Sequence, residues 1–223
     1  TKSTVLDFAD NQSRFANMMV DLGGSILTSN RYLLLRVFVN ASPDKVDLVR
    51  EKANEILFQA RELFTNPEMI KAFLEETKAK YIIHLAAMAW IPGCEENKEL
   101  AWNINVKSTE NLIKFAKKSW VEKFLYLQSA CIFSWDDAPY DEDSIANPKH
   151  YYGFTKAVAE EIVKTNNSDT FQTIIVRTNF TTMPWEYEKA FTDRFSTYLF
   201  AQWVAKWLKE VLIDNKWEQI IHI

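Results

Sequence analysis

The sequence predicts an α/β protein, a doubly wound parallel sheet followed by a short C-terminal lobe. Short apolar runs typical of strands buried on both faces alternate along the chain with stretches of helical periodicity. Such alternation favours parallel strands joined by right-handed crossover helices. A chain of 223 residues, 48% of them hydrophobic and 25% charged, is long enough for one sizeable core and short for two.

The expected elements follow one another from residue 32 onward. Strands are predicted at 32–39, 56–58, 81–85, 124–127, 173–178 and 219–223, and helices at 47–54, 69–77, 99–118, 151–163 and 202–212. Residues 90–96 are predicted as a loop at the carboxyl end of a strand, where open α/β sheets bind ligands.

Residues 1–30 stand apart from this alternation. Phe15, Met18, Met19 and Leu22 fall at i, i+3, i+4 and i+7, which places an apolar stripe on a helix that ends at Gly23-Gly24. Such a stripe is most often part of a core, but an added amphipathic helix also serves to bind a partner subunit. Both readings stay open at this point.

Bulk properties exclude several classes of protein. A net charge of −4 and a pI near 5.5 offer no basic surface for nucleic acid. No apolar run approaches the roughly 20 residues of a membrane helix, and the N-terminus lacks the layout of a signal peptide. The two cysteines make neither a disulfide framework nor a cysteine metal cluster, so a cytoplasmic location is the simplest expectation. The three histidines show no metal-ligand spacing, so we expect no metal.

The chemistry of the chain centres on Tyr152 and Lys156. Four residues apart, they lie about one turn apart on the same face of a helix, where an ammonium favours the phenolate. Ser129, at the end of the strand at 124–127, could hydrogen-bond the same substrate oxygen. The structural alternative is an aromatic stem packed along an aliphatic one.

At these residues the chain resembles the extended short-chain dehydrogenase/reductases, and among them the dTDP-4-dehydrorhamnose reductases and related sugar-nucleotide enzymes. The matching residues are Tyr81 to Ala87, Asn105-Val106, Ser129 to Phe133, Asn147-Pro148, Tyr152 to Lys156, Glu160 and Arg177-Thr178. The resemblance implies a Rossmann-like domain at 32–180 after an N-terminal helical extension at 1–31. A truncated substrate lobe with a final helix and strand would occupy 181–223.

The resemblance also implies roles for single residues. Tyr152 is expected to be the general acid/base, Lys156 to lower the pKa of Tyr152 and hold a nicotinamide ribose, and Ser129 to polarise the substrate. Asn105 would support Lys156 through water. The further residues expected to bind NADP or NAD are Ala41, Ser42, Lys45, Arg61, His84, Leu85, Ala86 and Ala87, and those expected to bind substrate are Trp90, Ser129, Asn179 and Arg194.

One feature departs from this pattern. The turn at 40–46 should be rich in glycine, because glycine lets the backbone approach a pyrophosphate, yet it contains none of the four glycines of the chain. Pro43 removes an amide donor and Asp44 adds a negative charge, which Lys45 partly offsets. Arg61 suits a 2′-phosphate, hence NADP, but a solvated surface arginine is the favoured alternative. His84 is either a cofactor-lining or a structural histidine.

Two hypotheses follow, with different partners. The first is an NAD(P)-dependent reductase or epimerase acting on a nucleotide-sugar, with Trp185, Lys189, Arg194 and Tyr198 of the C-terminal lobe available to contact it. The second is a non-catalytic relative, a regulatory or scaffolding subunit that binds a protein partner. An altered or incomplete enzyme is a third reading, and a homodimer is compatible with each of them.

Overall fold

The structure, a computed structural model, describes residues 66–136, 138–181, 199–214, 216 and 218–223. The expectations for the N-terminal extension and the first two strands lie outside the described residues, as do those for Ala41, Ser42, Lys45, Arg61, Trp185, Lys189, Arg194 and Tyr198. The described residues belong to two compact units, one holding residues up to Asn179 together with those from Asp214 onward, and one running from Phe180 to Ile213. Each is described by itself.

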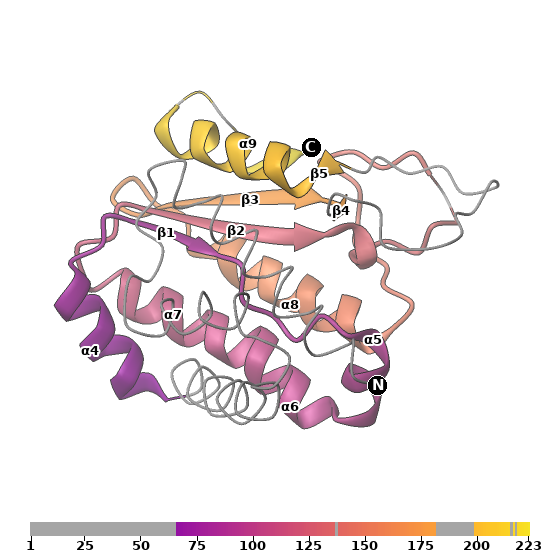
Figure 1. The fold of residues 1–223 in the computed structure, drawn as a ribbon, viewed down its shortest axis with the longest axis horizontal. Helices are drawn as coiled ribbons and strands as arrows, with labels where there is room; N and C mark the ends of the chain where they lie inside the picture. Colours follow the sequence, from indigo (N-terminus) through magenta and orange to yellow (C-terminus); the bar gives the residue numbers. More distant parts are fainter. Residues whose placement is uncertain (1–65, 137, 182–198, 215, 217) are drawn as a thin grey trace, which may run out of the picture. The chain divides into compact units, whose positions relative to one another are not determined.

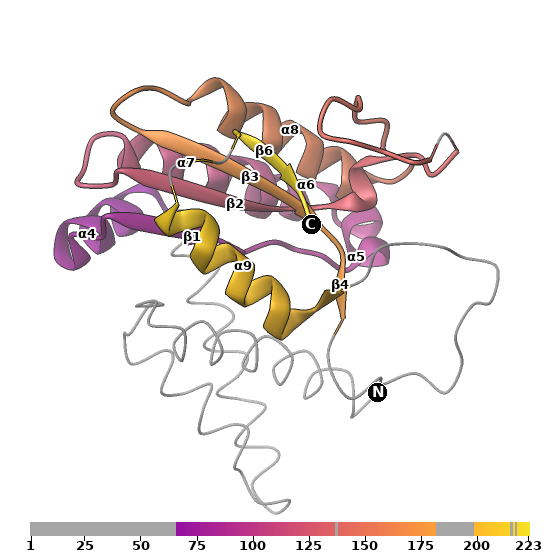
Figure 2. The same cartoon turned by 90° about the horizontal axis from the view of Figure 1, so that it is seen from above.

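The larger unit contains a parallel sheet of strands β1 (Tyr81–His84), β2 (Lys123–Ser129), β3 (Gln172–Thr178) and β6 (Ile220–His222). They lie side by side in the order β1-β2-β3-β6, as Figure 2 shows. The predicted parallel α/β architecture is confirmed in these residues. The last strand, expected in the C-terminal lobe, instead pairs with β3 and belongs to this sheet, because its apolar residues extend the buried β3 edge.

Helices α4 (Pro67–Thr77), α7 (Ser108–Ala116) and α8 (Tyr151–Thr165) lie along one face of this sheet (Figure 1). The helix expected at 99–118 is divided into α6 (Lys98–Trp102), a π-helical turn over Asn103–Lys107, and α7. The segment expected to be a loop at 90–96 contains a short helix, α5 (Ile91–Glu96). The loop prediction was wrong because Pro92 lies in the first turn of α5, where proline is compatible with a helix.

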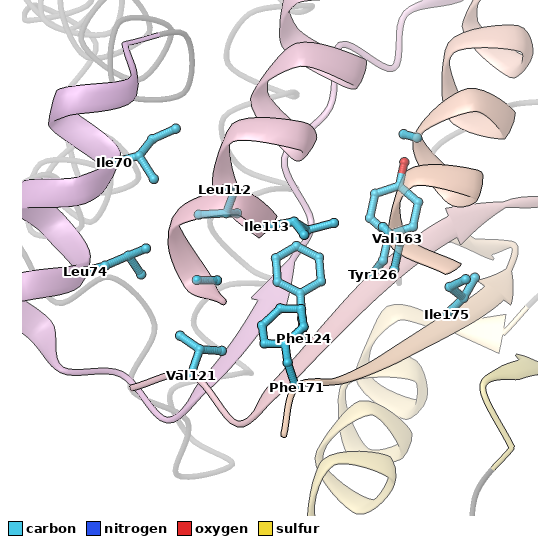
Figure 3. Packing of buried hydrophobic residues seen from close by; sticks show 12 residues of the cluster. Ile70, Leu74, Leu112, Ile113, Val121, Phe124, Tyr126, Val163, Phe171 and Ile175 are labelled. Carbon is cyan, nitrogen blue, oxygen red and sulfur yellow. The ribbon is translucent and has the colours of Figure 1, made fainter. Parts of the chain in front are cut away.

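The core between the sheet and these helices is a single cluster of apolar side chains (Figure 3). Phe124 and Tyr126 of β2 lie at its centre, and the ring of Phe124 packs against that of Phe171 with centroids 6.2 Å apart. The helices contribute Ile70, Leu74, Leu112, Ile113, Ala116, Ala159 and Val163. This packing fixes α8, which carries Tyr152 and Lys156, against β2, which ends at Ser129.

The smaller unit contains the parallel pair β4 (Phe180–Thr181) and β5 (Leu199–Phe200), and helix α9 (Ala201–Ile213). The buried side of α9 is formed by Val204, Ala205, Leu208 and Val211, so the helix predicted at 202–212 is confirmed. None of the helices within the described ranges has the length and apolar character that crossing a membrane requires.

Gly153→Ala is expected to lower the free energy of unfolding by about 1–3 kcal/mol, because the added methyl group overpacks a tight contact. A Cβ at Gly153 would lie 2.9 Å from the Cβ of Pro148 and closer still to the carbonyl oxygen of Cys131. Urea denaturation measures the change, with Lys164→Ala on the exposed side of α8 as the control. Equal stability of the two variants would contradict the close approach of α8 to the segment after β2.

Candidate active site

The candidate site lies where β2 ends and α8 begins. Ser129 is the last residue of β2, and its hydroxyl accepts a hydrogen bond from the backbone N–H of Cys131 at 3.2 Å. Tyr152 lies in the first turn of α8, which His150 caps by accepting the N–H of Gly153 at its Nδ1, 3.0 Å away. The carboxyl ends of parallel strands are the usual ligand-binding edge of such sheets.

Tyr152 is buried in a small cluster with Cys94 and Ala101. Burial raises the pKa of the Tyr152 phenol well above its usual value of 10.0, and the nearby Cys131 and Cys94 add to the rise. The nearby Ser129 hydroxyl acts in the opposite direction and lowers the pKa. The structure therefore brings Ser129 and Tyr152 together as expected, and the phenol is protonated at neutral pH.

Lys156 differs from its expected environment. Its Nζ donates to the carbonyl oxygen of Leu127 at 2.8 Å and lies 3.9 Å from the ring centroid of Tyr126. Burial lowers the pKa of Lys156 from 10.5 to about 7, although the negative charge of Glu160 raises it. Lys156 is not among the causes that shift the pKa of Tyr152, so the expected lowering of that pKa by the lysine is not found. Desolvation of the buried phenol is the largest cause of the rise in its pKa.

Replacement of Lys156 by methionine is expected to abolish a pH dependence of stability. The pKa of Lys156 in the folded chain, about 7, lies below the 10.5 of the ordinary side chain. Between these values the unfolded chain binds more protons, so wild-type stability should rise with pH over that range. The free-energy cost of burying the Lys156 ammonium is fully present at pH values below its pKa in the folded chain. A methionine side chain has no charge to bury, so this cost is absent at every pH.

Urea denaturation at several pH values from about 7 to about 10 tests this linkage. Lys164→Met, at an exposed position on the same helix, should keep the wild-type slope. Parallel pH profiles for Lys156→Met and the wild type would show that the lysine is solvated rather than buried.

Asn105 lies in the π-helical turn, the kind of local irregularity that is frequent at functional sites. Its Oδ1 accepts the N–H of Met88 at 2.7 Å, and its Nδ2 donates to the carbonyl oxygen of Met88 and to the hydroxyl of Thr155 at 3.1 and 2.9 Å. Both side-chain N–H bonds are thus used to join the segment after β1 to α8. The structure gives Asn105 no direct contact with Lys156, and the water-mediated role stays a prediction.

His84 is buried, and its role as a cofactor-lining residue stays a prediction. Its Nε2 lies 3.0 Å from the hydroxyl of Thr109, and its ring packs against Phe124 and Tyr126. Burial, together with the charge of Lys156, lowers the pKa of His84 to about 3, so the ring is neutral.

The remaining expected residues lie after strand ends. Leu85, Ala86 and Ala87 are partly exposed just after β1, where a cofactor could lie against the sheet edge. Trp90 is 63% exposed before α5. Asn179 follows β3 and is partly buried. Their expected roles in binding cofactor and substrate stay predictions.

A buried polar network behind the site includes a residue to which sequence reasoning gave no role. Glu160 and Arg177 form an ion pair, with Oε1 and the guanidinium NH2 2.5 Å apart, and Gln128 donates to Glu160 Oε2 at 2.8 Å. Glu160 and Arg177 are among the residues that match the family in the sequence. For Gln128, the feature of the sequence that could have indicated a role is its position directly before Ser129.

The parallel sheet, with Ser129, Tyr152 and Lys156 at its carboxyl edge, has the Rossmann-like fold of known structures. Residues 38–216 match the NAD dependent epimerase/dehydratase family, and the chain belongs to that family. The resemblance seen in the sequence is therefore confirmed.

Individual relatives match parts of the chain. It is 40% identical over 99 residues to the methionine adenosyltransferase 2 subunit beta of Xenopus laevis, covering 44% of this chain and 29% of that protein. The fold is similar to that of a dTDP-4-dehydrorhamnose reductase from Clostridium acetobutylicum, with a TM-score of 0.60 at 22% identity, over 72% of this chain and 61% of that one. The fold is also similar to that of the Bacillus anthracis dTDP-4-dehydrorhamnose reductase, solved in complex with NADP. The TM-score is 0.59 at 21% identity, over 72% of this chain and 62% of that one. The chain thus spans less than two thirds of each.

The described residues fit one end of a nicotinamide dinucleotide. Lys156 has three N–H donors and uses one of them, on Leu127, within the described part of the chain. Its other donors suit the vicinal hydroxyls of a ribose. The residues expected at the pyrophosphate lie outside the described ranges.

Proposed function

We propose that this chain is an NAD(P)-dependent reductase or epimerase acting on a sugar-nucleotide, with Ser129, Tyr152 and Lys156 as its catalytic residues. The observation that carries the proposal is that Ser129, at the carboxyl end of β2, lies close enough to the buried Tyr152 phenol to lower its pKa. A phenol whose pKa is raised by burial keeps its proton at neutral pH, so it is ready to act as a general acid.

The roles of these side chains follow from their protonation states. Tyr152 Oη would donate its proton to the carbonyl oxygen of a keto sugar as that oxygen gains negative charge. Ser129 would donate a hydrogen bond to the same oxygen, since its Oγ already accepts from Cys131 and its O–H remains to donate. Lys156 Nζ would hold the ribose hydroxyls of the cofactor. The bound nicotinamide would supply or accept the hydride.

Calorimetric titration with NADPH and then NADH tests the cofactor. Micromolar binding that weakens at least about tenfold in Lys156→Met, the equivalent of one hydrogen bond to a charged group, is expected. Lys164→Met should bind as the wild type does, because that side chain is exposed and distant along α8. No binding of either cofactor at millimolar concentration would overturn the proposal. A screen of dTDP- and UDP-linked keto sugars, followed by the absorbance of NADPH, then identifies the substrate.

A second candidate function is favoured by a specific observation. The chain shares 40% identity over 99 residues with a protein named as a subunit, the beta subunit of methionine adenosyltransferase 2. Together with the glycine-free turn at 40–46, this supports a regulatory or scaffolding subunit. Co-elution of the chain with purified methionine adenosyltransferase, without turnover of any keto sugar, would favour this function over the first.

The cytoplasmic location stays a prediction.

A further inference from the structure

Gln128 connects the two elements that carry the candidate catalytic residues. Its side chain is 2% exposed and makes three hydrogen bonds. Oε1 accepts the backbone N–H of Ser129 at 2.8 Å, while Nε2 donates to the backbone carbonyl of Lys156 at 2.9 Å and to Glu160 Oε2 at 2.8 Å. One planar amide therefore contacts the backbone of Ser129 on β2 and of Lys156 on α8.

The orientation of this amide is determined by its partners. If it were flipped, Nε2 would face the N–H of Ser129, which is also a donor, and Oε1 would face the carboxylate of Glu160, which is also an acceptor. Both contacts would be repulsive in a buried site. The assignment therefore holds, and Gln128 has a defined donor side and a defined acceptor side.

The donor side of Gln128 contacts the carboxylate of Glu160, whose position is fixed by its other partner. Glu160 pairs with Arg177, whose NH1 donates to the backbone carbonyls of Asp141 and Glu142 at 3.3 and 3.0 Å. Glu160 and Arg177 are 3% and 6% exposed. Because the Arg177 guanidinium is hydrogen-bonded on several sides, the Glu160 carboxylate has little freedom to move. The carboxylate therefore restrains the side chain of Gln128.

We propose that Gln128 is a positioning residue that holds Ser129 at its working distance from Tyr152 and Lys156. The inference rests on the proposed function for its effect on turnover, whereas the contact itself can be tested without turnover. Ser129 must stay within hydrogen-bond reach of Tyr152 for both to address one substrate oxygen. Releasing its backbone N–H would let the end of β2 shift relative to α8, and displacements of about 1 Å cost on the order of 100-fold in rate.

Two substitutions separate the two sides of the amide. Gln128→Met keeps the length of the side chain but removes every hydrogen bond. Gln128→Glu keeps an acceptor for Ser129 and loses the donor to Glu160 until the introduced carboxyl is protonated. Gln219→Met is the matched control, because Gln219 bonds the other end of α8 to β3, with Nε2 2.9 Å from the Lys164 carbonyl and 2.8 Å from Thr173 Oγ1.

The first readout is amide hydrogen exchange of Ser129 by NMR in the full chain. Gln128→Met is expected to speed this exchange at least about tenfold, the equivalent of one lost hydrogen bond, while Gln219→Met leaves it unchanged. The second readout is turnover with NAD(P)H. In Gln128→Met kcat should fall on the order of 100-fold with the KM for cofactor nearly unchanged, and Gln219→Met should keep kcat.

Gln128→Glu provides a result that a merely structural residue would not give. Its kcat should recover as pH falls, since a protonated carboxyl regains a donor for Glu160. If Gln128→Met fails to fold, this pH dependence still tests whether Gln128 positions Ser129. Unchanged Ser129 exchange, or a kcat of Gln128→Met equal to wild type, would overturn the inference. A wild-type chain with no turnover would overturn the proposed function alone, and the exchange result would still decide whether Gln128 holds Ser129.

Discussion

Arg177→Met is expected to lower the free energy of unfolding by about 3–5 kcal/mol, the largest effect on stability that we predict. The guanidinium forms a direct ion pair with Glu160, at 2.5 Å, and both side chains are buried. Without it the carboxylate would keep its hydrogen bond from Gln128 but lose its counter-charge in a site from which water is excluded. The cost is that of an uncompensated buried charge rather than of the pair itself.

Urea denaturation of two further variants distinguishes this cause from loss of packing. The double variant Glu160→Gln with Arg177→Met should recover much of the lost stability, because no unpaired charge is then buried. Lys80→Met breaks the exposed ion pair between Lys80 and Glu122 and should cost less than about 1 kcal/mol. A loss in Arg177→Met no larger than in Lys80→Met would mean that water reaches Glu160.

The layout of the described sheet could be predicted from the sequence because its strands are short apolar runs separated by amphipathic stretches. Two of the details that differ from the prediction have local causes. Helix α5 was missed because the segment after a strand end was taken as a loop, although Pro92 suits a first helical turn. The break in the helix at 99–118 arises where Asn105 bonds to Met88, a contact between segments that periodicity does not register.

The site residues could be located from the sequence, but their protonation states could not. The spacing of Tyr152 and Lys156 places them on one helix, and Ser129 follows from the end of β2. The raised pKa of Tyr152 depends on burial beside Cys94 and Ala101, about fifty residues away in the chain. Likewise, the lowered pKa of Lys156 reflects the depth of the core on which α8 packs.

Tyr152→Phe is expected to reduce kcat by about 10²–10⁴-fold in the proposed reaction, the usual contribution of a positioned general acid. Phenylalanine fills the same buried space, so stability and the binding of NADPH should change little. Because burial raises the pKa of Tyr152, the wild-type rate of carbonyl reduction should not fall through loss of the phenol proton until pH exceeds 10.0. Pre-steady-state and steady-state rates of NADPH oxidation across pH measure both effects.

The matched control for this prediction is Tyr140→Phe, which removes a hydroxyl 3.3 Å from Ser134 in the loop after β2. It should leave kcat unchanged. Ser129→Ala should also lower kcat, but less than Tyr152→Phe, since it removes a hydrogen bond and leaves the proton donor in place. If Tyr152→Phe kept more than about a tenth of the wild-type rate, a general acid's contribution would be absent. The proton would then come from another group, and the pairing of Ser129 with Tyr152 would serve binding rather than catalysis.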